Sequence, residues 1–244
     1  MINKLVLQSV ISKYHLNGLV DSVKWVTDDN GFNVKFMSPN NDMLGRVSYT
    51  KSFLHNSEVA IYNTSQLNKL LGITSGDLNI DLNKSGKIYT KLLISDSNCD
   101  LSYALADTLL IPRVAEVNEP DTYEMQLTLT AENIEYIIKY KNAVGSDLVI
   151  VQPITDPQKG TVLSLTFGEG ADHANKIQYD IPCTTTDTFI DPLPFASEVI
   201  KEILVANKDM SEAYMHINSE GIMKLTFSSD DIKTTYFLIG KADI

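Results

Sequence analysis

The sequence predicts an α+β protein that is built from two copies of one module. Two distant stretches share one arrangement, in which alternating apolar residues lead into Asn-x-x-Gly and a second alternating strand follows. Asn83 and Asn218 are 135 positions apart in the sequence, and so are Gly86 and Gly221. A repeat period this long indicates a duplicated domain rather than a solenoid of short repeats.

The order of the predicted elements supports the duplication. Each copy reads as a helix, three or four strands, a second helix and three strands, and two helices can cover only one face of so many strands. In the first copy we expect helices over residues 7–18 and 64–72 and strands over residues 20–26, 32–37, 44–49 and 59–62, followed by a meander over 77–105. In the second copy we expect helices over residues 131–139 and 195–207, strands over 124–129, 148–154, 161–167 and 177–181, and a meander that ends at Gly240.

Short polar signals mark the predicted turns and helix starts. Asp-Asn-Gly before residue 32 indicates a hairpin, and Asn63 and Thr130 are expected to cap the helices that follow them. Residues 110–123 contain Pro112 and Pro120 with little periodicity, so they read as an extended connector. The predicted domains are therefore residues 1–109 and 124–244, joined by residues 110–123.

The composition is that of a globular protein with a full core, at 43% hydrophobic and 21% charged residues. No apolar run reaches the length of a membrane span, and the first residues do not resemble a secretion signal. Cys99 and Cys183 stand alone without a nearby His, which favours buried reduced thiols in a cytosolic protein over a metal site. We expect neither a metal nor a cofactor.

The distribution of charge qualifies the net charge of −11, which by itself argues against a nucleic-acid partner. Asp and Glu make up 31 of the 244 residues, yet none occurs in residues 1–20 or 59–76, where both first-copy helices are expected. These windows carry Lys4, Lys13 and Lys69. They are either ordinary solvated helix faces or a surface that meets a polyanion.

Residues 58–72, EVAIYNTSQLNKLLG, resemble the central strand and helix of the sliding clamps of T-even-like bacteriophages. Those clamps are ring-shaped processivity factors of DNA polymerases and are related to proliferating cell nuclear antigen. Residues 131–139, AENIEYIIK, are similar to the matching helix of the second domain. With the duplicated element order, the resemblance covers essentially the whole chain.

The resemblance implies a DNA clamp fold, with antiparallel sheets outside and helices that line a central hole. It implies a homotrimeric ring that encircles duplex DNA, contacts phosphates without reading bases, and tethers the replicative polymerase. Lysine suits weak sliding contacts because it is a hydrated point charge. By matching positions, the DNA-facing residues are expected to be Lys4, Lys13, Lys69, Lys139, Lys201 and Lys208, whereas Lys141 falls toward the apolar side of its helix.

The resemblance also implies protein partners: the polymerase, a clamp loader and, in some members, the transcription machinery, all inside an infected host cell. Such partners insert a hydrophobic peptide beside the connector. Here that pocket would involve Leu110, Ile111, Val114, Val117 and Ile239. Taken one by one, these residues fit connector packing against the sheet at least as well.

Two other functions fit parts of the sequence less well or equally well. An enzyme is disfavoured because Gly168-Glu-Gly170 with Asp172-His173 lacks the continuation of a phosphate-binding loop, and the four histidines share no spacing. A strand-rich structural virion or assembly protein is the stronger alternative, since antiparallel meanders and an acidic surface fit it equally. Amphipathic helices with lysine on the polar face favour the clamp.

Overall fold

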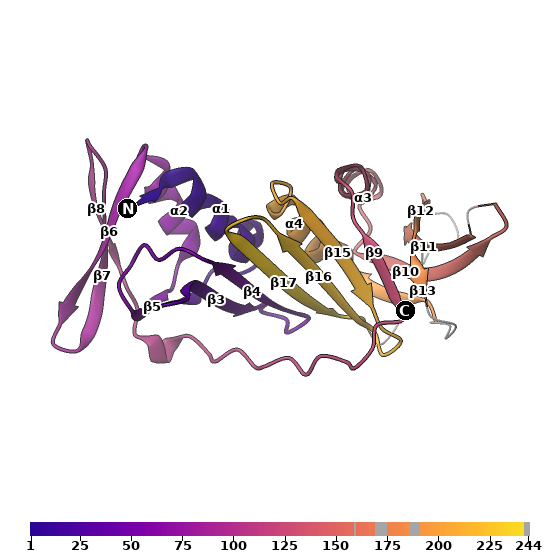
Figure 1. Ribbon diagram of the computed structural model, residues 1–244, viewed down its shortest axis with the longest axis horizontal. Helices are drawn as coiled ribbons and strands as arrows, with labels where there is room; N and C mark the ends of the chain where they lie inside the picture. The colour runs from indigo at the N-terminus through magenta and orange to yellow at the C-terminus, as the bar shows by residue number, and fades with distance from the viewer. Residues whose placement is uncertain (159, 169–174, 186–190, 242–244) are drawn as a thin grey trace. The chain divides into compact units, whose positions relative to one another are not determined.

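The computed structural model describes residues 1–158, 160–168, 175–185 and 191–241 (Figure 1). The chain divides into two compact units. The first unit comprises Met1–Ala115 with Asp230–Thr234, and the second comprises Glu116–Ser229 with Thr235–Ile244. The division falls inside the stretch that we read as a connector, which has no regular secondary structure between Ile111 and Glu124.

The first unit holds two helices and two antiparallel sheets. One sheet has the hydrogen-bonded order β4-β3-β2-β5, and the other has the order β1-β6-β7-β8. The elements are β1 (Ile2–Asn3), α1 (Lys4–His15), the 3₁₀ turn η1 (Leu16–Gly18), β2 (Val23–Asp28), β3 (Gly31–Met37), β4 (Met43–Tyr49), β5 (Ser57–Ile61), α2 (Thr64–Gly72), β6 (Asp77–Ser85), β7 (Ile88–Ser95), β8 (Asp100–Ala104) and the 3₁₀ turn η2 (Thr108–Leu110).

The second unit repeats this plan. Its strands are ordered β12-β11-β10-β14 in one sheet, and β13-β9-β15-β16-β17 in the other. The elements are β9 (Met125–Thr128), α3 (Ala131–Val144), β10 (Leu148–Asp156), β11 (Gly160–Phe167), β12 (Ile177–Pro182), β13 (Thr184–Thr185), β14 (Leu193–Ala196), α4 (Ser197–Ala206), β15 (Glu212–Ile217), β16 (Ile222–Ser228) and β17 (Ile232–Ile239).

The two units share one topology, which confirms the duplication predicted from the sequence. In each unit a first strand precedes a helix, further strands follow (four in the first unit, five in the second), and a second helix leads into a three-stranded meander that pairs with the first strand. The two helices of each unit pack against each other, α1 against α2 and α3 against α4. The fold class is α+β, as expected.

The repeated glycines have the predicted conformation, although the two turns differ. Gly86 has φ +64° and Gly221 has φ +85°, the left-handed region that glycine enters without steric cost. In the first unit the strand continues past Asn83, and Gly86-Lys87 forms the two-residue turn between Ser85 and Ile88. In the second unit the turn opens at Asn218, whose side-chain oxygen accepts a hydrogen bond from the amide of Ile222 at 2.8 Å.

Three strands were not predicted, because each is short and stabilised by distant partners. Strand β1 has two residues and pairs with β6, β13 likewise has two and pairs with β9, and β14 pairs with β10. Helix α1 also ends earlier than expected, since Leu16 adopts the left-handed conformation with φ 47° and closes it before Gly18.

A buried aromatic cluster holds the first unit together. The indole nitrogen of Trp25 on β2 donates a hydrogen bond to the hydroxyl of Tyr14 on α1 at 3.1 Å, so the polar atoms of two buried rings satisfy each other. The Trp25 ring packs edge-on against Phe32 and Phe53. This packing fixes which face of α1 is inward and therefore which of its residues reach solvent.

Candidate nucleic-acid interface

The two helices of the first unit contain no acidic residue. Asn3 caps α1 by accepting a hydrogen bond from the amide of Leu5 at 3.0 Å, and Asn63 caps α2 through the amide of Gln66 at 2.7 Å. Neutral amides therefore occupy helix starts where Asp is equally common. Because neither helix contains Asp or Glu, the carboxylates beside this layer come from flanking segments, with Asp77 hydrogen-bonded to Asn3 and Asp21 hydrogen-bonded to Ser65.

Lys69 and Lys4 differ in how far they are available to a ligand. Lys69 is exposed on α2, and it forms no ion pair within the described part of the chain. The ammonium of Lys4 instead donates hydrogen bonds to the carbonyl oxygens of Gly72, at 3.0 Å, and Thr74. These carbonyls lie at the end of α2, where helical partners run out. Lys4 therefore stabilises the end of α2 and is less free to meet a phosphate than predicted.

The prediction that Lys13 faces DNA is wrong. Its side chain is fully buried, and its ammonium lies 3.1 Å from the hydroxyl oxygen of Ser9 one turn earlier in α1. Helical spacing placed Lys13 at the edge of the polar face, but the packed structure covers that edge. A side chain with no solvent-accessible area cannot contact a phosphate through water.

In the second unit, Lys139 and Lys208 are exposed near one carboxylate. Lys139 lies on α3 with 60% of its side chain exposed, and its ammonium is 2.7 Å from Glu135 one turn earlier. The hydrogen bond from Lys139 lowers the pKa of Glu135, and the positive charge of Lys208 adds to that shift. Since exposed ion pairs are weak, Lys139 can exchange Glu135 for another anion at little cost.

Lys201 is more strongly neutralised than the sequence suggested. Its ammonium lies 2.7 Å from Glu198 and 2.9 Å from Glu202, which is buried, and only 21% of its side chain is exposed. The hydrogen bonds that Lys201 donates to both carboxylates raise the pKa of Lys201. Lys141, which we expected toward the apolar side, is buried and lies 3.2 Å from Glu198. The acidic residues of α4 therefore hold two lysines of this unit in place.

The helices of the two units thus differ in charge. Of the six lysines predicted to face DNA, three are exposed: Lys69 in the first unit, and Lys139 and Lys208 in the second. The second unit also exposes Glu132, Glu135 and Glu198 on its helices. The uneven charge that the sequence indicated for the second copy is therefore present in the structure.

His15, Ser65 and Asp21 form a polar cluster in the first unit that the sequence did not predict. The imidazole nitrogen Nε2 of His15 lies 3.0 Å from the hydroxyl of Ser65 and 3.4 Å from a carboxylate oxygen of Asp21. A nucleophilic triad requires the acid and the nucleophile on opposite ring nitrogens, and here both approach the same one. Asp21 also accepts a hydrogen bond from the amide of Ser65 at 2.7 Å. The cluster therefore anchors the start of α2 and lacks catalytic geometry.

The residues predicted to bind a partner peptide fall into different environments. Leu110 and Ile239 are exposed, at 64% and 52%, whereas Ile111 is buried at 6%. Val114 and Val117 are half-buried. Ile111 therefore packs in the core of the first unit. The assignment of all five residues to a partner pocket remains a prediction.

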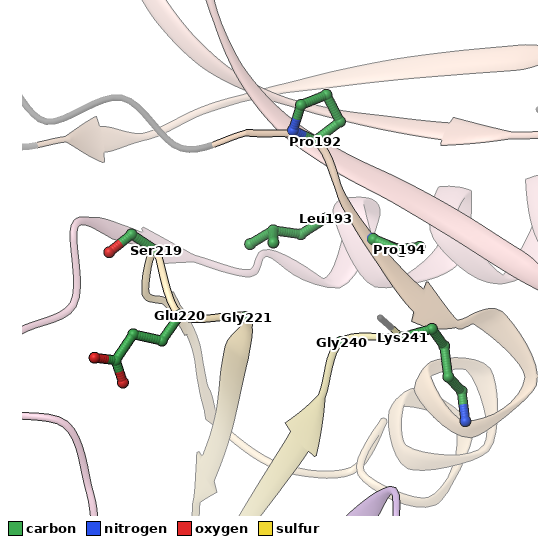
Figure 2. A pocket seen from close by; sticks show the side chains of 8 residues that line it. All are labelled: Pro192, Leu193, Pro194, Ser219, Glu220, Gly221, Gly240 and Lys241. Atoms are coloured by element: carbon green, nitrogen blue, oxygen red, sulfur yellow. The ribbon is translucent and has the colours of Figure 1, made fainter. Parts of the chain in front are cut away.

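The second unit contains a pocket of about 370 Å³ beside Ile239, between β14, the turn at Asn218 and the end of β17 (Figure 2). Two backbone hydrogen bonds join the segments that line it. The amide of Gly240 donates to the Gly221 oxygen at 2.7 Å, and the amide of Lys241 donates to the Pro194 oxygen at 2.8 Å. The Leu193 side chain extends into the space between the strands, while Glu220 points outward. The pocket is lined by Pro192, Leu193, Pro194, Ser219, Glu220, Gly221, Gly240 and Lys241.

Sequence reasoning missed this pocket because its walls come from three separate segments. One signal was present, since the repeated Asn-x-x-Gly turn that revealed the duplication supplies Ser219, Glu220 and Gly221. Glycine is favoured at position 221 because a side chain at its φ of +85° would be strained.

Other kinds of site find little support among the described residues. No group of three or more His, Cys, Asp or Glu side chains could hold a metal ion, within the residues that the structure describes. No helix in the same residues is long and apolar enough to cross a membrane. Glu169, Gly170, Asp172 and His173, weighed above as part of a loop, lie outside the described residues.

Comparison with known proteins identifies the fold. No protein-family model matches the sequence, and no curated protein matches it. Among solved structures, proliferating cellular nuclear antigen from Entamoeba histolytica is similar with a TM-score of 0.76 at 15% identity, over 98% of this chain and 96% of that chain. PCNA of A. fulgidus, solved with the C-terminal region of FEN-1, is similar with a TM-score of 0.76 at 14% identity, over 100% and 98% of the two chains. The chain therefore has the fold of proliferating cell nuclear antigen, the DNA clamp fold that its sequence led us to expect.

Proposed function

We propose that the protein is a sliding clamp that encircles duplex DNA and tethers a replicative DNA polymerase, without catalysing a reaction itself. The observation that carries this proposal is the duplicated unit, which matches PCNA over nearly the full length of both chains. In keeping with the sequence resemblance, we place the clamp in a bacteriophage replication complex in the infected cell. A structural virion protein would share the sheets but would not need this whole-chain match.

The ring would be a homotrimer, with the first unit of one chain against the second unit of the next. Strand β12 supports this arrangement, because it lies at the edge of its sheet and its outer side pairs with no strand in the described residues. An unpaired edge offers hydrogen-bonding groups to another chain. A contact between unlike surfaces closes into a ring when the rotation between subunits allows it.

Half-buried tyrosines beside this edge provide apolar area for such a contact. On α3, Tyr136 and Tyr140 stack with ring centroids 5.6 Å apart, and Tyr179 of β12 packs against both rings. The amide of Asn133 donates a hydrogen bond to the Tyr179 hydroxyl at 2.9 Å, which fixes this ring. Aromatic side chains are enriched at protein interfaces because they combine large area with few rotatable bonds.

The first unit offers an apolar surface at its own edge strand. Residue Ala106 forms a single bridge to Ala60 on β5, and the next residues lead into η2. Leu109 is 88% exposed, Leu110 is 64% exposed, and Tyr62 at the end of β5 is 59% exposed. Several large exposed apolar side chains close together indicate a contact surface. We assign Leu109 and Tyr62 to contact with the neighbouring chain in the ring, while Leu110 stays with the residues predicted to bind a partner peptide.

Weak contacts to DNA would come from the exposed lysines Lys69, Lys139 and Lys208. Lysine attracts phosphates without base recognition, and each neutralised phosphate adds about 0.9 to the salt dependence of binding. Few charges suit a ring that must slide. The large net charge of −11 keeps tight non-specific binding elsewhere on the protein unfavourable.

Partner proteins would bind the pocket beside Ile239. Its size and its Leu193, Pro192 and Pro194 lining suit one or two apolar side chains of an extended peptide. The similar A. fulgidus protein was solved with the C-terminal region of FEN-1, which supports peptide capture by this fold. A polymerase and a clamp loader are the partners we propose, with transcription machinery as a further candidate.

Mass in solution and polymerase stimulation test the proposal together. Light scattering should give about three times the 27.1 kDa mass of the chain at micromolar concentration. The triple variant Lys69→Glu, Lys139→Glu, Lys208→Glu should keep this mass and lose retention on DNA. A stable monomer, a large open polymer, or full retention by the triple variant at physiological salt would contradict the proposal.

A further inference from the structure

The end of the connector, residues 119–124, is held on the sheet of the second unit at two points, and we call these residues the strap. The Glu119 carboxylate accepts a hydrogen bond from the ammonium group of Lys224 on β16 at 2.5 Å. The Glu124 carboxylate accepts one from the amide of Ser219, in the turn after β15, at 2.8 Å. These contacts fasten both ends of the strap to the hairpin of β15 and β16.

Tyr123 of the strap packs its ring on the imidazole of His216 on β15, with ring centroids 5.5 Å apart. Each ring buries a polar atom. The Tyr123 hydroxyl oxygen and Nδ1 of His216 both lack a hydrogen-bond partner among the residues that the structure describes. A buried polar atom without a partner has lost its hydrogen bond to water and gained none in return. The contact that closes the strap therefore contains two unfavourable groups, and its stability depends on the charge of His216.

The charges around His216 favour its neutral form. Lys224 lies directly opposite His216 in the antiparallel register of β15 and β16. The Glu119 carboxylate, which would attract an imidazolium, is already bonded to Lys224. On the other neighbouring strand, Gln126 of β9 lies opposite His216 and is uncharged. A protonated His216 would therefore stand beside a like charge, which is unfavourable for directly opposed residues of a sheet.

A second pocket, of about 520 Å³, gives solvent access to His216 but supplies no anion. Tyr214 and Cys183 line it together with His216, and no Asp, Glu, Lys or Arg belongs to its lining among the described residues. Burial raises the pKa of the Cys183 thiol, which keeps the thiol neutral near pH 7. The pocket is large enough for several water molecules. A proton can therefore reach His216 from solvent without a counter-charge waiting there.

Protonation of His216 should oppose the packed strap. Burial lowers the pKa of His216 below its usual 6.5, Lys224 adds to the shift, and Glu119 opposes it. An imidazolium carries N–H on both nitrogens, so the buried Nδ1 would become a charged donor without an acceptor. Once Tyr123 moves away, water can solvate Nδ1 and the imidazole takes up its proton near the usual pKa. The packed strap is therefore fully favoured above about pH 6.5 and loses stability as the pH falls below it.

We propose that His216 is a pH-sensitive latch for the strap: the neutral imidazole keeps Tyr123 packed on β15, and protonation of the imidazole releases residues 119–124 from the sheet. Burial and the nearby Glu119 raise the pKa of Tyr123 to about 12, so Tyr123 stays neutral while His216 titrates. The latch lies within the second unit and requires neither a ring nor DNA. Val117, predicted to bind a partner peptide, lies two residues before the strap, so release would also change that site, a consequence that rests on the proposed function.

Fluorine NMR of protein labelled with fluorotyrosine tests the latch. The Tyr123 signal is the one that disappears in Tyr123→Phe, and its shift between H2O and D2O measures how much water contacts the ring. In the wild type this solvent shift should be small at pH 7 and should increase on acidification, with a midpoint below about pH 6.5. In His216→Gln, which is neutral at every pH of the titration, the solvent shift of Tyr123 should not change with pH.

The matched control is His15→Gln, which removes a half-buried histidine of the first unit and should leave the Tyr123 transition unchanged. His216→Phe is a second neutral variant and should abolish the transition as His216→Gln does. Far-UV circular dichroism should show that the wild type keeps its secondary structure at pH 5. Absence of the transition in the wild type, its persistence in both His216 variants, or simultaneous loss of secondary structure would overturn the inference. A monomer in light scattering would contradict the proposed function and leave the latch intact.

Discussion

The ammonium nitrogen of Lys4 lies 3.0 Å from the carbonyl oxygen of Gly72, which joins the start of α1 to the end of α2 across 68 positions of sequence. The amide of Lys4 also donates a hydrogen bond to the oxygen of Gly76, at 2.9 Å. The positive charge stands where the carbonyl ends of α2 concentrate negative potential. The two helices of the first unit are therefore held together by a residue that the sequence assigned to DNA.

Replacing Lys4 with Ala should destabilise the protein by about 1 to 2 kcal/mol, because carbonyl groups at the end of α2 lose a charged donor. Urea unfolding measures the change. Lys69→Ala on the exposed face of α2 is the control and should change stability by less than about 0.5 kcal/mol. If Lys4→Ala were as mild as the control and reduced the salt dependence of DNA binding instead, the structural role would be wrong.

Lys13→Glu should destabilise the protein by about 3 kcal/mol or more, since it places a carboxylate in a site without solvent access. Thermal unfolding should show a clear loss in melting temperature, whereas Lys69→Glu should melt near the wild type. A Lys13→Glu protein of normal stability that had lost only DNA retention would return Lys13 to the DNA-facing set.

Acid should weaken the fold through His15. Burial lowers the pKa of His15 below its usual 6.5, although nearby Asp21 opposes the shift. With the folded pKa lowered, the unfolded chain takes up the proton first. Stability is therefore full above about pH 6.5 and falls as the pH drops below it. His15→Gln should flatten part of this decline in unfolding free energy between pH 7 and pH 5. An equally steep decline in the variant would assign it to other groups, such as His216, whose pKa burial also lowers.

Two glycines of the first unit should differ sharply in tolerance. Gly31 has φ +119°, and a Cβ there would lie 2.2 Å from the Tyr49 carbonyl oxygen, so Gly31→Ala must displace backbone. Gly86 has φ +64° with no atom within 4 Å of the Cβ position. We expect Gly86→Ala to cost about 1 kcal/mol and Gly31→Ala at least twice as much. Denaturant unfolding measures the loss of unfolding free energy in each variant. Equal losses in Gly31→Ala and Gly86→Ala would contradict the close backbone approach at Gly31.

The sequence was sufficient for features set by local chemistry. The hairpin at Gly31, the caps at Asn63 and Thr130 and the positive φ of Gly86 and Gly221 each follow from a few adjacent residues. The duplication followed from spacing alone. Whether a lysine faces DNA depends on which residues its ammonium group contacts in the folded protein, and adjacent residues in the sequence do not determine that.

Contacts over long sequence distances explain what was missed. Lys4 reaches carbonyls of a helix 68 positions away, and Lys141 reaches Glu198 on another helix. Periodicity places a residue on a face and cannot tell whether a neighbouring element covers that face, which is how Lys13 was misassigned. The pocket beside Ile239 needed three segments to be brought together, so only one of its walls had a sequence signal.

The central claim, that the protein holds DNA by encircling it, is tested most directly by blocking a DNA end. The protein is allowed to thread onto duplexes fixed to a surface at one end, and the free biotinylated end is then either capped with streptavidin or left open. Dissociation is followed by fluorescence. The account predicts that capped duplexes retain the protein many times longer than open ones at physiological salt. Equal dissociation from capped and open duplexes would contradict it.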